Sequence, residues 1–244
     1  MKTIAVIPAR LHSTRFPKKI LYPIDNKPMV AHVFDQAKKA KSLDDVIVAI
    51  DADDTADALK KLKIKYVMTS KDHISGTDRI AEVIADQDVE VIINIQADEP
   101  QVDPNLIDLL VSQFEDETIE MATVAGMNMD AKKLTDVNTV KVLLDRERFA
   151  VNFRRDPIES EAGGYYHHMG IYAYRKSVLD KFTSLEPSKN EIKFQLEQYR
   201  ALDNGIRIKV VLTEKVNKGI DTLDDLKRVE LAMKNDPLMS TYIA

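Results

Sequence analysis

The chain has 244 residues, with 35 Lys and Arg against 40 Asp and Glu, which gives a formal net charge of −5. The 44% hydrophobic and 31% charged residues exclude a disordered chain, and this length can bury a sizeable core in one large domain or two small ones. The mild acidity argues against a protein that coats nucleic acid, and the absence of cysteine excludes disulfides, a catalytic thiol and thiolate metal sites.

The first half of the sequence predicts short buried strands that alternate with amphipathic helices. Strands are expected over 3–8, 45–50, 65–68 and 89–95, and helices over 28–40, 54–62 and 78–85. The strand segments are continuously apolar, which is typical of strands whose two faces are both covered by helices. This order predicts βαβ units and a mainly parallel sheet, in which ligands bind at the carboxyl ends of the strands.

The second half of the sequence is less regular. Strands are expected over 140–144, 170–174 and 206–212, helices over 188–202 and 222–233, and a loop near 156–164. Asn204 and Gly205 are typical of a helix end, and Thr222 is the expected N-cap of the last helix. We therefore expect a single α/β domain over 1–235, with a smaller mixed subregion at roughly 120–210 and a loosely held tail over 236–244.

Two further patterns concern the N-terminal part. Only four consecutive apolar residues, 4–7, precede Pro8, which is too short for a signal-peptide core, and no other apolar segment approaches the roughly 18 residues of a membrane span. We therefore expect a cytoplasmic protein without membrane insertion. The first of the seven glycines is Gly76, which excludes a glycine-rich phosphate loop in the first 75 residues.

A basic segment, residues 9–19, follows the first predicted strand. It carries four strong cations and two hydroxyls, namely Arg10, Arg15, Lys18, Lys19, Ser13 and Thr14. Side chains of these types can hold a polyphosphate in place of glycine amides. A solvated basic loop is the alternative, but the position at a strand end favours the phosphate site.

Acidic residues follow the strand 89–95 and precede the last helix. Asp98 and Glu99 at a strand end can bind Mg²⁺, which prefers oxygen ligands and shares them with nucleotide phosphates. The alternative is a turn before Pro100 in which Asp98 caps a backbone amide. Asp221, taken alone, is favoured as a helix-start residue over a metal ligand.

Residues 75–79 and 167–172 leave similar alternatives open. The first segment forms either a phosphate or base loop, or a plain helix cap by Thr77 or Asp78. His167 and His168 point to opposite faces of an extended segment, so one buried and one solvated imidazole is favoured over a shared metal. The same spacing rule places His168 and Tyr172 on one face.

Taken in order, eight segments resemble the 3-deoxy-manno-octulosonate (Kdo) cytidylyltransferases, also called CMP-Kdo synthetases. They run from Ile4 to about Met233 and comprise 7–10 with 13–17, 27–29, 75–79, 96–100, 140–142, 168–172, 197–200 and 221–222. The resemblance implies a nucleotide-diphospho-sugar transferase-like α/β fold, usually a homodimer, with a mostly parallel sheet flanked by helices. It also implies an enzyme that uses Mg²⁺ to couple CTP to Kdo, giving CMP-Kdo and pyrophosphate for lipopolysaccharide biosynthesis.

The same resemblance implies roles for individual residues. Those that bind the nucleotide would be Arg10, Ser13, Thr14, Arg15, Lys19, Ser75, Gly76, Thr77, Arg79 and Gln96. Those that contact the sugar acid would be Gln96, Arg155, His168, Tyr172, Glu197 and Gln198. Asp98 and Asp221 would bind the metal, and with Arg10 and Lys19 they would form the catalytic set.

The chain also departs from the family pattern. Ala97 stands where the family usually has Gly, residues 17–20 differ from Pro-Gly-Lys-Pro, and Arg154, Asp156 and Glu159 replace smaller residues or proline beside Arg155. A related sugar acid, such as 8-amino-8-deoxy-Kdo or a nonulosonic acid, is therefore the alternative substrate. The sequence leaves lipopolysaccharide and capsule pathways both open. A non-catalytic nucleotide-binding regulator is the alternative of another class, and the two separated aspartates argue against it.

Overall fold

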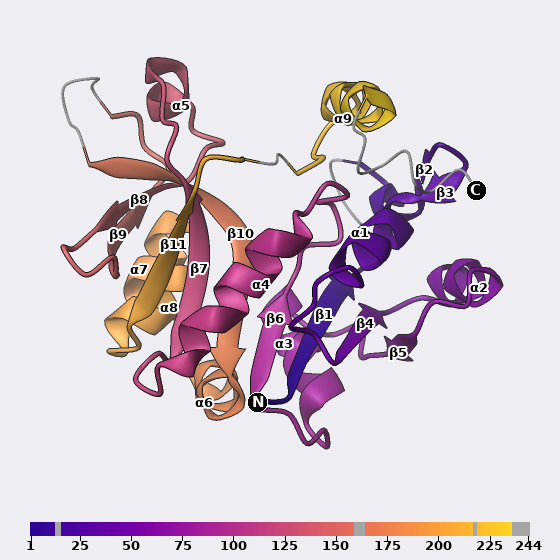
Figure 1. Ribbon diagram of the computed structural model, residues 1–244, viewed down its shortest axis with the longest axis horizontal. Helices are drawn as coiled ribbons and strands as arrows, with labels where there is room; N and C mark the ends of the chain where they lie inside the picture. Colours follow the sequence, from indigo (N-terminus) through magenta and orange to yellow (C-terminus); the bar gives the residue numbers. More distant parts are fainter. Residues whose placement is uncertain (13–15, 159–163, 217–218, 236–244) are drawn as a thin grey trace. The chain divides into compact units, whose positions relative to one another are not determined.

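The computed structural model in Figure 1 describes residues 1–12, 16–158, 164–216 and 219–235. The chain divides into two compact units. Unit 1 comprises Met1–Thr3, Asp88–Ile93 and Leu106–Val216, and unit 2 comprises Ile4–Gln87, Asn94–Asn105 and Asn217–Ala244. Within the described ranges, no helix combines the length and the apolar character that crossing a bilayer requires.

Unit 2 contains three parallel strands in the order β1 (Thr3–Ala9), β4 (Asp45–Ile50) and β5 (Tyr66–Met68). Nearly every residue of β1 and β4 is buried, which explains their continuously apolar sequences. The helices of this unit are α1 (Met29–Ala37), α2 (Asp53–Lys61), α3 (Gly76–Ile84) and α9 (Leu223–Asn235). A 3-10 helix, η1 (Lys19–Leu21), and a short hairpin, β2 (Pro23–Ile24) with β3 (Lys27–Pro28), follow the basic segment.

The packing of α9 brings the C-terminal part of the chain against the basic segment. Leu226, Val229 and Met233 of α9 share a buried cluster with Phe16, Ile24, Met29 and Ile220. Burial of these side chains fixes the start of α9, where Asp221 lies. The residue therefore comes close to segments that are about 200 positions earlier in the sequence, such as the one that carries Lys19.

Unit 1 is built on mixed strand pairing. β7 (Met121–Gly126) pairs in parallel with β11 (Ile208–Thr213) and antiparallel with β10 (Tyr165–Arg175). β8 (Lys141–Leu144) lies between β10 and β9 (Ala150–Arg154) and pairs antiparallel with both. The remaining elements include β6 (Val91–Asn94), η2 (Gln113–Glu115), α4 (Pro104–Ser112), α5 (Ala131–Thr135), α6 (Lys176–Ser184), α7 (Lys189–Phe194) and α8 (Gln198–Asp203).

The predicted α/β fold class and the order of elements in the first half are confirmed. The predicted subregion 120–210 falls within the segment Leu106–Val216 of unit 1, while a single domain over 1–235 stays a prediction. The predicted tail, 236–244, lies outside the described residues.

One element prediction in the second half is wrong, and another is confirmed with a different start. The helix expected over 188–202 is two helices, α7 and α8, because Gln195 adopts a left-handed conformation with φ 54° that ends α7. The strand expected over 170–174 is the longer β10, so His167 and His168 lie inside a strand rather than before it. β10 also has an irregular register against β7 between Met169 and Tyr172.

Candidate active site

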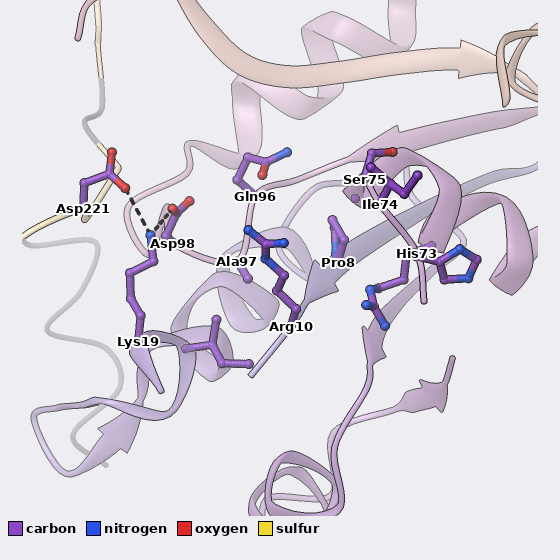
Figure 2. A pocket seen from close by; sticks show the side chains of 13 residues that line it. Pro8, Arg10, Lys19, His73, Ile74, Ser75, Gln96, Ala97, Asp98 and Asp221 are labelled. Atoms are coloured by element: carbon purple, nitrogen blue, oxygen red, sulfur yellow. Dashed lines mark hydrogen bonds and ion pairs between the residues drawn. The ribbon is translucent and has the colours of Figure 1, made fainter. Parts of the chain in front are cut away.

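A cavity of about 310 Å³ opens in unit 2, near the end of β1 and the start of α3 (Figure 2). Its lining comprises Pro8, Arg10, Lys19, Ile20, His73, Ile74, Ser75, Gly76, Arg79, Gln96, Ala97, Asp98 and Asp221. Most of these residues belong to segments that the sequence predicts to bind a ligand at the carboxyl ends of strands. Ligand sites of α/β folds commonly lie at such strand ends.

Lys19 joins the two predicted metal-binding aspartates. Its Nζ lies 2.6 Å from Asp98 Oδ2 and 3.4 Å from Asp221 Oδ1. Dashed lines mark both contacts in Figure 2. The lysine side chain is only 12% exposed, against 27% for Asp98 and 50% for Asp221. Two carboxylates that are far apart in the sequence therefore converge on one cation in a half-buried site.

The carboxylate of Asp221 is available for this contact because its neighbour caps the helix. Thr222 Oγ1 accepts a hydrogen bond from the Asp225 amide at 3.1 Å, and the Thr222 amide donates to Asp225 Oδ2 at 3.0 Å. The prediction of Thr222 as N-cap is confirmed, and Asp221, which the sequence alone favours as a helix-start residue, lies one position before that cap. A backbone bond from the Ile220 amide to the Asp98 carbonyl, 3.0 Å long, holds the two aspartate segments together.

Glu99 does not join Asp98 in the cavity. Its side chain is buried, and burial, followed by repulsion from Asp98, raises the pKa of Glu99 to about 8. The carboxyl group is therefore mostly protonated at neutral pH. Of the two neighbouring acids that the sequence offers as metal ligands, only Asp98 lines the cavity.

The start of α3 supplies a second side of the cavity. Ser75 Oγ accepts from the Asp78 amide at 3.1 Å, and the Ser75 amide donates to Asp78 Oδ2 at 3.2 Å, so the cap is Ser75 rather than Thr77 or Asp78. A Cβ at Gly76 would lie 3.2 Å from Pro8 Cγ, which favours glycine where α3 approaches β1. A helix N-terminus carries partial positive charge and favours an anion in this position.

Arg79 is tied to other protein groups. Its guanidinium is 3% exposed, lies 3.1 Å from Asp51 Oδ2 and donates to Thr69 Oγ1. The other Asp51 oxygen accepts from the Leu11 amide at 2.9 Å. Arg79 therefore anchors the start of the basic segment, and its predicted contact with the nucleotide stays a prediction.

The other predicted nucleotide residues fall into three groups. Arg10 and Gln96 line the cavity, and Gln96 Nε2 donates to Asn94 Oδ1 at 3.2 Å. Thr77 is buried in α3 and is not among the lining residues. Ser13, Thr14 and Arg15 lie outside the described residues.

Most of the predicted sugar-acid residues gather in unit 1. The rings of His168 and Tyr172 lie 5.5 Å apart, and Gln198 Nε2 donates to the Tyr172 hydroxyl. His168 Nε2 is 3.0 Å from Thr123 Oγ1. Gln198 Oε1 is buried and has no hydrogen-bond partner among the residues that the structure describes. An unsatisfied buried acceptor of this kind is costly and suits a ligand hydroxyl.

The charges of this cluster follow from burial. Burial, followed by the charges of His167 and Arg155, lowers the pKa of His168 to about 3, so the imidazole is neutral at pH 7. Burial also raises the pKa of Tyr172 well above its ordinary value, with smaller effects of Tyr174 and Glu197. Arg155 and Glu197, the other two predicted residues, thus act electrostatically on this cluster.

No sequence motif assigns a role to Thr123, Asp51 or Lys141. Thr123 and Asp51 lie outside the candidate motifs, because a buried hydroxyl in a strand or a buried acid directly after one has no distinctive spacing. Lys141 falls in the segment 140–142, which carries part of the resemblance. Its burial within β8 could not be predicted from that segment.

Comparison with known proteins agrees with this arrangement. A family model described as cytidylyltransferase matches residues 4–209. The 3-deoxy-manno-octulosonate cytidylyltransferase of Chloroherpeton thalassium is 40% identical over 94% of this chain and 97% of its own. The enzyme of the same name from Solibacter usitatus is 41% identical over 96% of this chain and 95% of its own. The chain belongs to the 3-deoxy-manno-octulosonate cytidylyltransferase family.

Solved structures support the same family. A CMP:2-keto-3-deoxy-manno-octonic acid synthetase, solved in complex with CTP, matches with a TM-score of 0.91 and 34% identity, covering 96% of this chain and 99% of its own. A cytidylyltransferase from Leptospira borgpetersenii matches with a TM-score of 0.67 at 18% identity, covering 97% of this chain and 88% of its own, and shows the fold alone. The Kdo cytidylyltransferase family thus accounts for nearly the whole chain.

Proposed function

We propose that the chain transfers CMP from CTP to Kdo and releases pyrophosphate. The observation that carries this proposal is the convergence of Lys19, Asp98 and Asp221 in a cavity that Arg10 and the start of α3 also line. A non-catalytic nucleotide-binding regulator would not need two separated carboxylates at one point. The names of the relatives favour Kdo over 8-amino-8-deoxy-Kdo or a nonulosonic acid.

The reaction is an in-line substitution at phosphorus. The anomeric hydroxyl oxygen of the sugar acid bonds to the α-phosphorus of CTP, the bond from that phosphorus to the α,β-bridging oxygen breaks and releases pyrophosphate, and the hydroxyl proton passes to water. Such a step depends on positioning and on neutralising charge rather than on a covalent intermediate. Arg10 and Lys19 supply positive charge in the cavity, and the start of α3 supplies amide donors.

The residues around Lys19 also fit Mg²⁺. The two carboxylates already converge on a cation, the Lys19 ammonium group. The described residues contain no group of three or more His, Asp or Glu side chains that could hold a metal by themselves. Mg²⁺ is commonly held by one or two carboxylates together with water and substrate phosphates. We expect Asp98 and Asp221 to hold it, and a bound Mg²⁺ would supply charge neutralisation at the phosphates.

The cluster in unit 1 suits a sugar acid. The neutral His168 imidazole, the Tyr172 hydroxyl and the open Gln198 Oε1 offer hydrogen-bonding groups to sugar hydroxyls. Arg155 offers a guanidinium that can bind a carboxylate through two parallel hydrogen bonds. This set supports the proposal of a polyhydroxylated acid as acceptor.

Three further parts of the function extend the same proposal. We expect a homodimer, as the family resemblance implies, and a cytoplasmic location, because CTP is a cytoplasmic nucleotide. We also expect the product to serve lipopolysaccharide biosynthesis. None of these expectations involves nucleic acid, which agrees with the net charge of −5.

The test is pyrophosphate release from CTP with a panel of sugar acids at equal concentration. We expect the highest kcat/KM with Kdo, and lower values with 8-amino-8-deoxy-Kdo and with a nonulosonic acid. Release with one of the other two acids and none with Kdo would contradict the substrate while retaining the reaction. CTP binding without release in every case would favour the regulator.

A further inference from the structure

Lys141 is a fully buried lysine in the middle of unit 1. It lies on β8, and its side chain is 0% exposed. Its Nζ donates to two main-chain carbonyls, that of Asp136 at 2.6 Å and that of Arg155 at 2.8 Å. Lysine is almost never fully buried unless its ammonium group is paired, so these two bonds compensate a costly desolvation. The ammonium group thus joins the segment before β8 to the segment after β9.

The sheet register places Lys141 next to two segments that carry predicted sugar-acid residues. Lys141 lies opposite Arg154 on β9 and opposite His167 on β10, each the immediate neighbour of a predicted contact residue. The amide of His168 donates to the carbonyl of Val140 at 2.9 Å. The strand that carries Lys141 therefore contacts both the His168 and the Arg155 segments.

Arg155 depends on this support. It follows the last residue of β9, so its backbone has no place in the strand ladder that ends at Arg154. Its side chain is exposed, yet its charge acts on both His168 and Tyr172. The bond from Lys141 Nζ to its carbonyl fixes the main chain at the point from which the guanidinium extends.

We propose that Lys141 is a positioning residue of the sugar-acid site, which holds the main chain at Arg155 and so fixes the point from which the Arg155 guanidinium extends. The inference rests on the proposed function, since it takes Arg155 as the group that binds the sugar carboxylate. Lys141 acts through Arg155 and does not itself contact the substrate. Loss of its ammonium group therefore weakens the use of the sugar acid and leaves the use of CTP unchanged.

The test compares Lys141→Met with the matched control Val142→Ala. Methionine keeps the length and apolar stem of lysine but removes the donor and the charge. Val142 is the next residue of β8 and is also 0% exposed, so its truncation weakens the same strand from the opposite face. Thermal unfolding of both variants shows whether their losses of stability are comparable.

We expect Lys141→Met to raise the KM for Kdo by about tenfold to a hundredfold, the range for a displaced substrate-positioning group, with the KM for CTP within about twofold of wild type. Val142→Ala should leave the ratio of the two KM values unchanged. Equal ratios in the two variants would show that Lys141 only supports the fold, and would overturn the proposal.

A double-mutant cycle tests whether the effect passes through Arg155. In an Arg155→Ala background, Lys141→Met should raise the KM for Kdo by less than about twofold, because the group that it positions is already gone. Multiplicative effects of the two substitutions would contradict the proposal.

If Lys141→Met does not fold, Lys141→Gln, which keeps a shorter neutral donor, replaces it. An equal rise of the KM for Kdo and the KM for CTP in this variant would overturn the proposal. A wild type that releases no pyrophosphate from CTP and Kdo would instead refute the proposed function.

Discussion

Asp98 and Asp221 share one ammonium group, and this contact makes them the most informative single residues in unit 2. Asp98→Asn and Asp221→Asn should each cost roughly 2–4 kcal/mol of transition-state stabilisation, the scale expected when one electrostatic interaction is removed from a reacting centre. The double variant should be little worse than either single one, because groups that act as a unit are not additive.

The measurement is kcat/KM across a magnesium titration for the wild type, both single variants and the double variant. A shared metal predicts that all three variants need more Mg²⁺ than the wild type. Because Thr222 caps α9, Asp221→Asn should leave the free energy of unfolding nearly unchanged. A loss of activity in this variant can then not be caused by unfolding. Full activity of Asp221→Asn, or strictly additive losses in the double variant, would contradict a shared site.

The Glu99 carboxyl predicts a pH dependence of stability. Its pKa is raised from 4.5 to about 8, first by burial and then by Asp98, so the folded protein holds a proton that the unfolded chain loses at lower pH. This contribution to stability is complete below about pH 4.5 and is lost as the pH rises through about 8. His168, whose pKa is lowered to about 3, contributes in the opposite direction on the acid side.

Comparison of the wild type with Glu99→Gln isolates the Glu99 contribution, because His168 is present in both. Between about pH 5 and pH 8, the wild type should lose about 1–4 kcal/mol of unfolding free energy relative to the variant. Urea unfolding at several pH values within this range provides the measurement. Parallel curves for the two proteins would show that Glu99 titrates near its ordinary pKa.

Among the elements, α3 and α7 begin with the same capping box but lie in different units. Ser75→Ala and Ser188→Ala should each cost about 1 kcal/mol of stability, because each removes an N-cap acceptor. Only Ser75 lines the cavity, so only Ser75→Ala should also raise the KM for CTP. Thermal unfolding of the two variants measures the capping effect, and steady-state kinetics measures the effect on CTP binding. An equal change of the KM for CTP in both variants would show that Ser75 has no role in CTP binding beyond the cap.

Two of the strands that the sequence predicts correctly share one property. β1 and β4 are apolar along their whole length because both faces are buried, so their sequences need no tertiary context. The break between α7 and α8 has no such local signal, since the left-handed residue is Gln195 rather than glycine or asparagine. β7 and α4 are also not predicted from the sequence. Their short apolar segments fit either a strand or a helix, so no local signal decides between the two.

The site shows the same limit at the level of contacts. The basic segment and the aspartates are evident from the sequence, but the pairing of Asp221 with Asp98 comes from the resemblance and not from spacing. The resemblance assigns Arg79 to the nucleotide, and Arg79 lines the cavity, but its bonds to Asp51 and Thr69 could not be predicted from the sequence. The direction of a buried side chain depends on which segments pack around it, and one sequence does not contain that information.

For the whole molecule, the predicted nucleotide residues and the predicted sugar-acid residues divide between the two units, except Gln96 of unit 2, which is predicted to contact both substrates. Those that line the cavity belong to unit 2, while His168, Tyr172, Gln198 and Arg155 belong to unit 1. Substitutions in the two sets should therefore affect different substrates. The division also makes the choice of nucleotide and the choice of acceptor separately measurable.

The most direct test of CMP transfer combines all four nucleoside triphosphates with Kdo and measures pyrophosphate and the nucleotide-sugar product together. We expect CTP to give the two products in equal amounts, and ATP, GTP and UTP to give at least about a hundredfold lower kcat/KM, as for a site whose polar groups match one base. Comparable turnover of ATP, or pyrophosphate without an equal amount of CMP-Kdo, would contradict the proposed reaction.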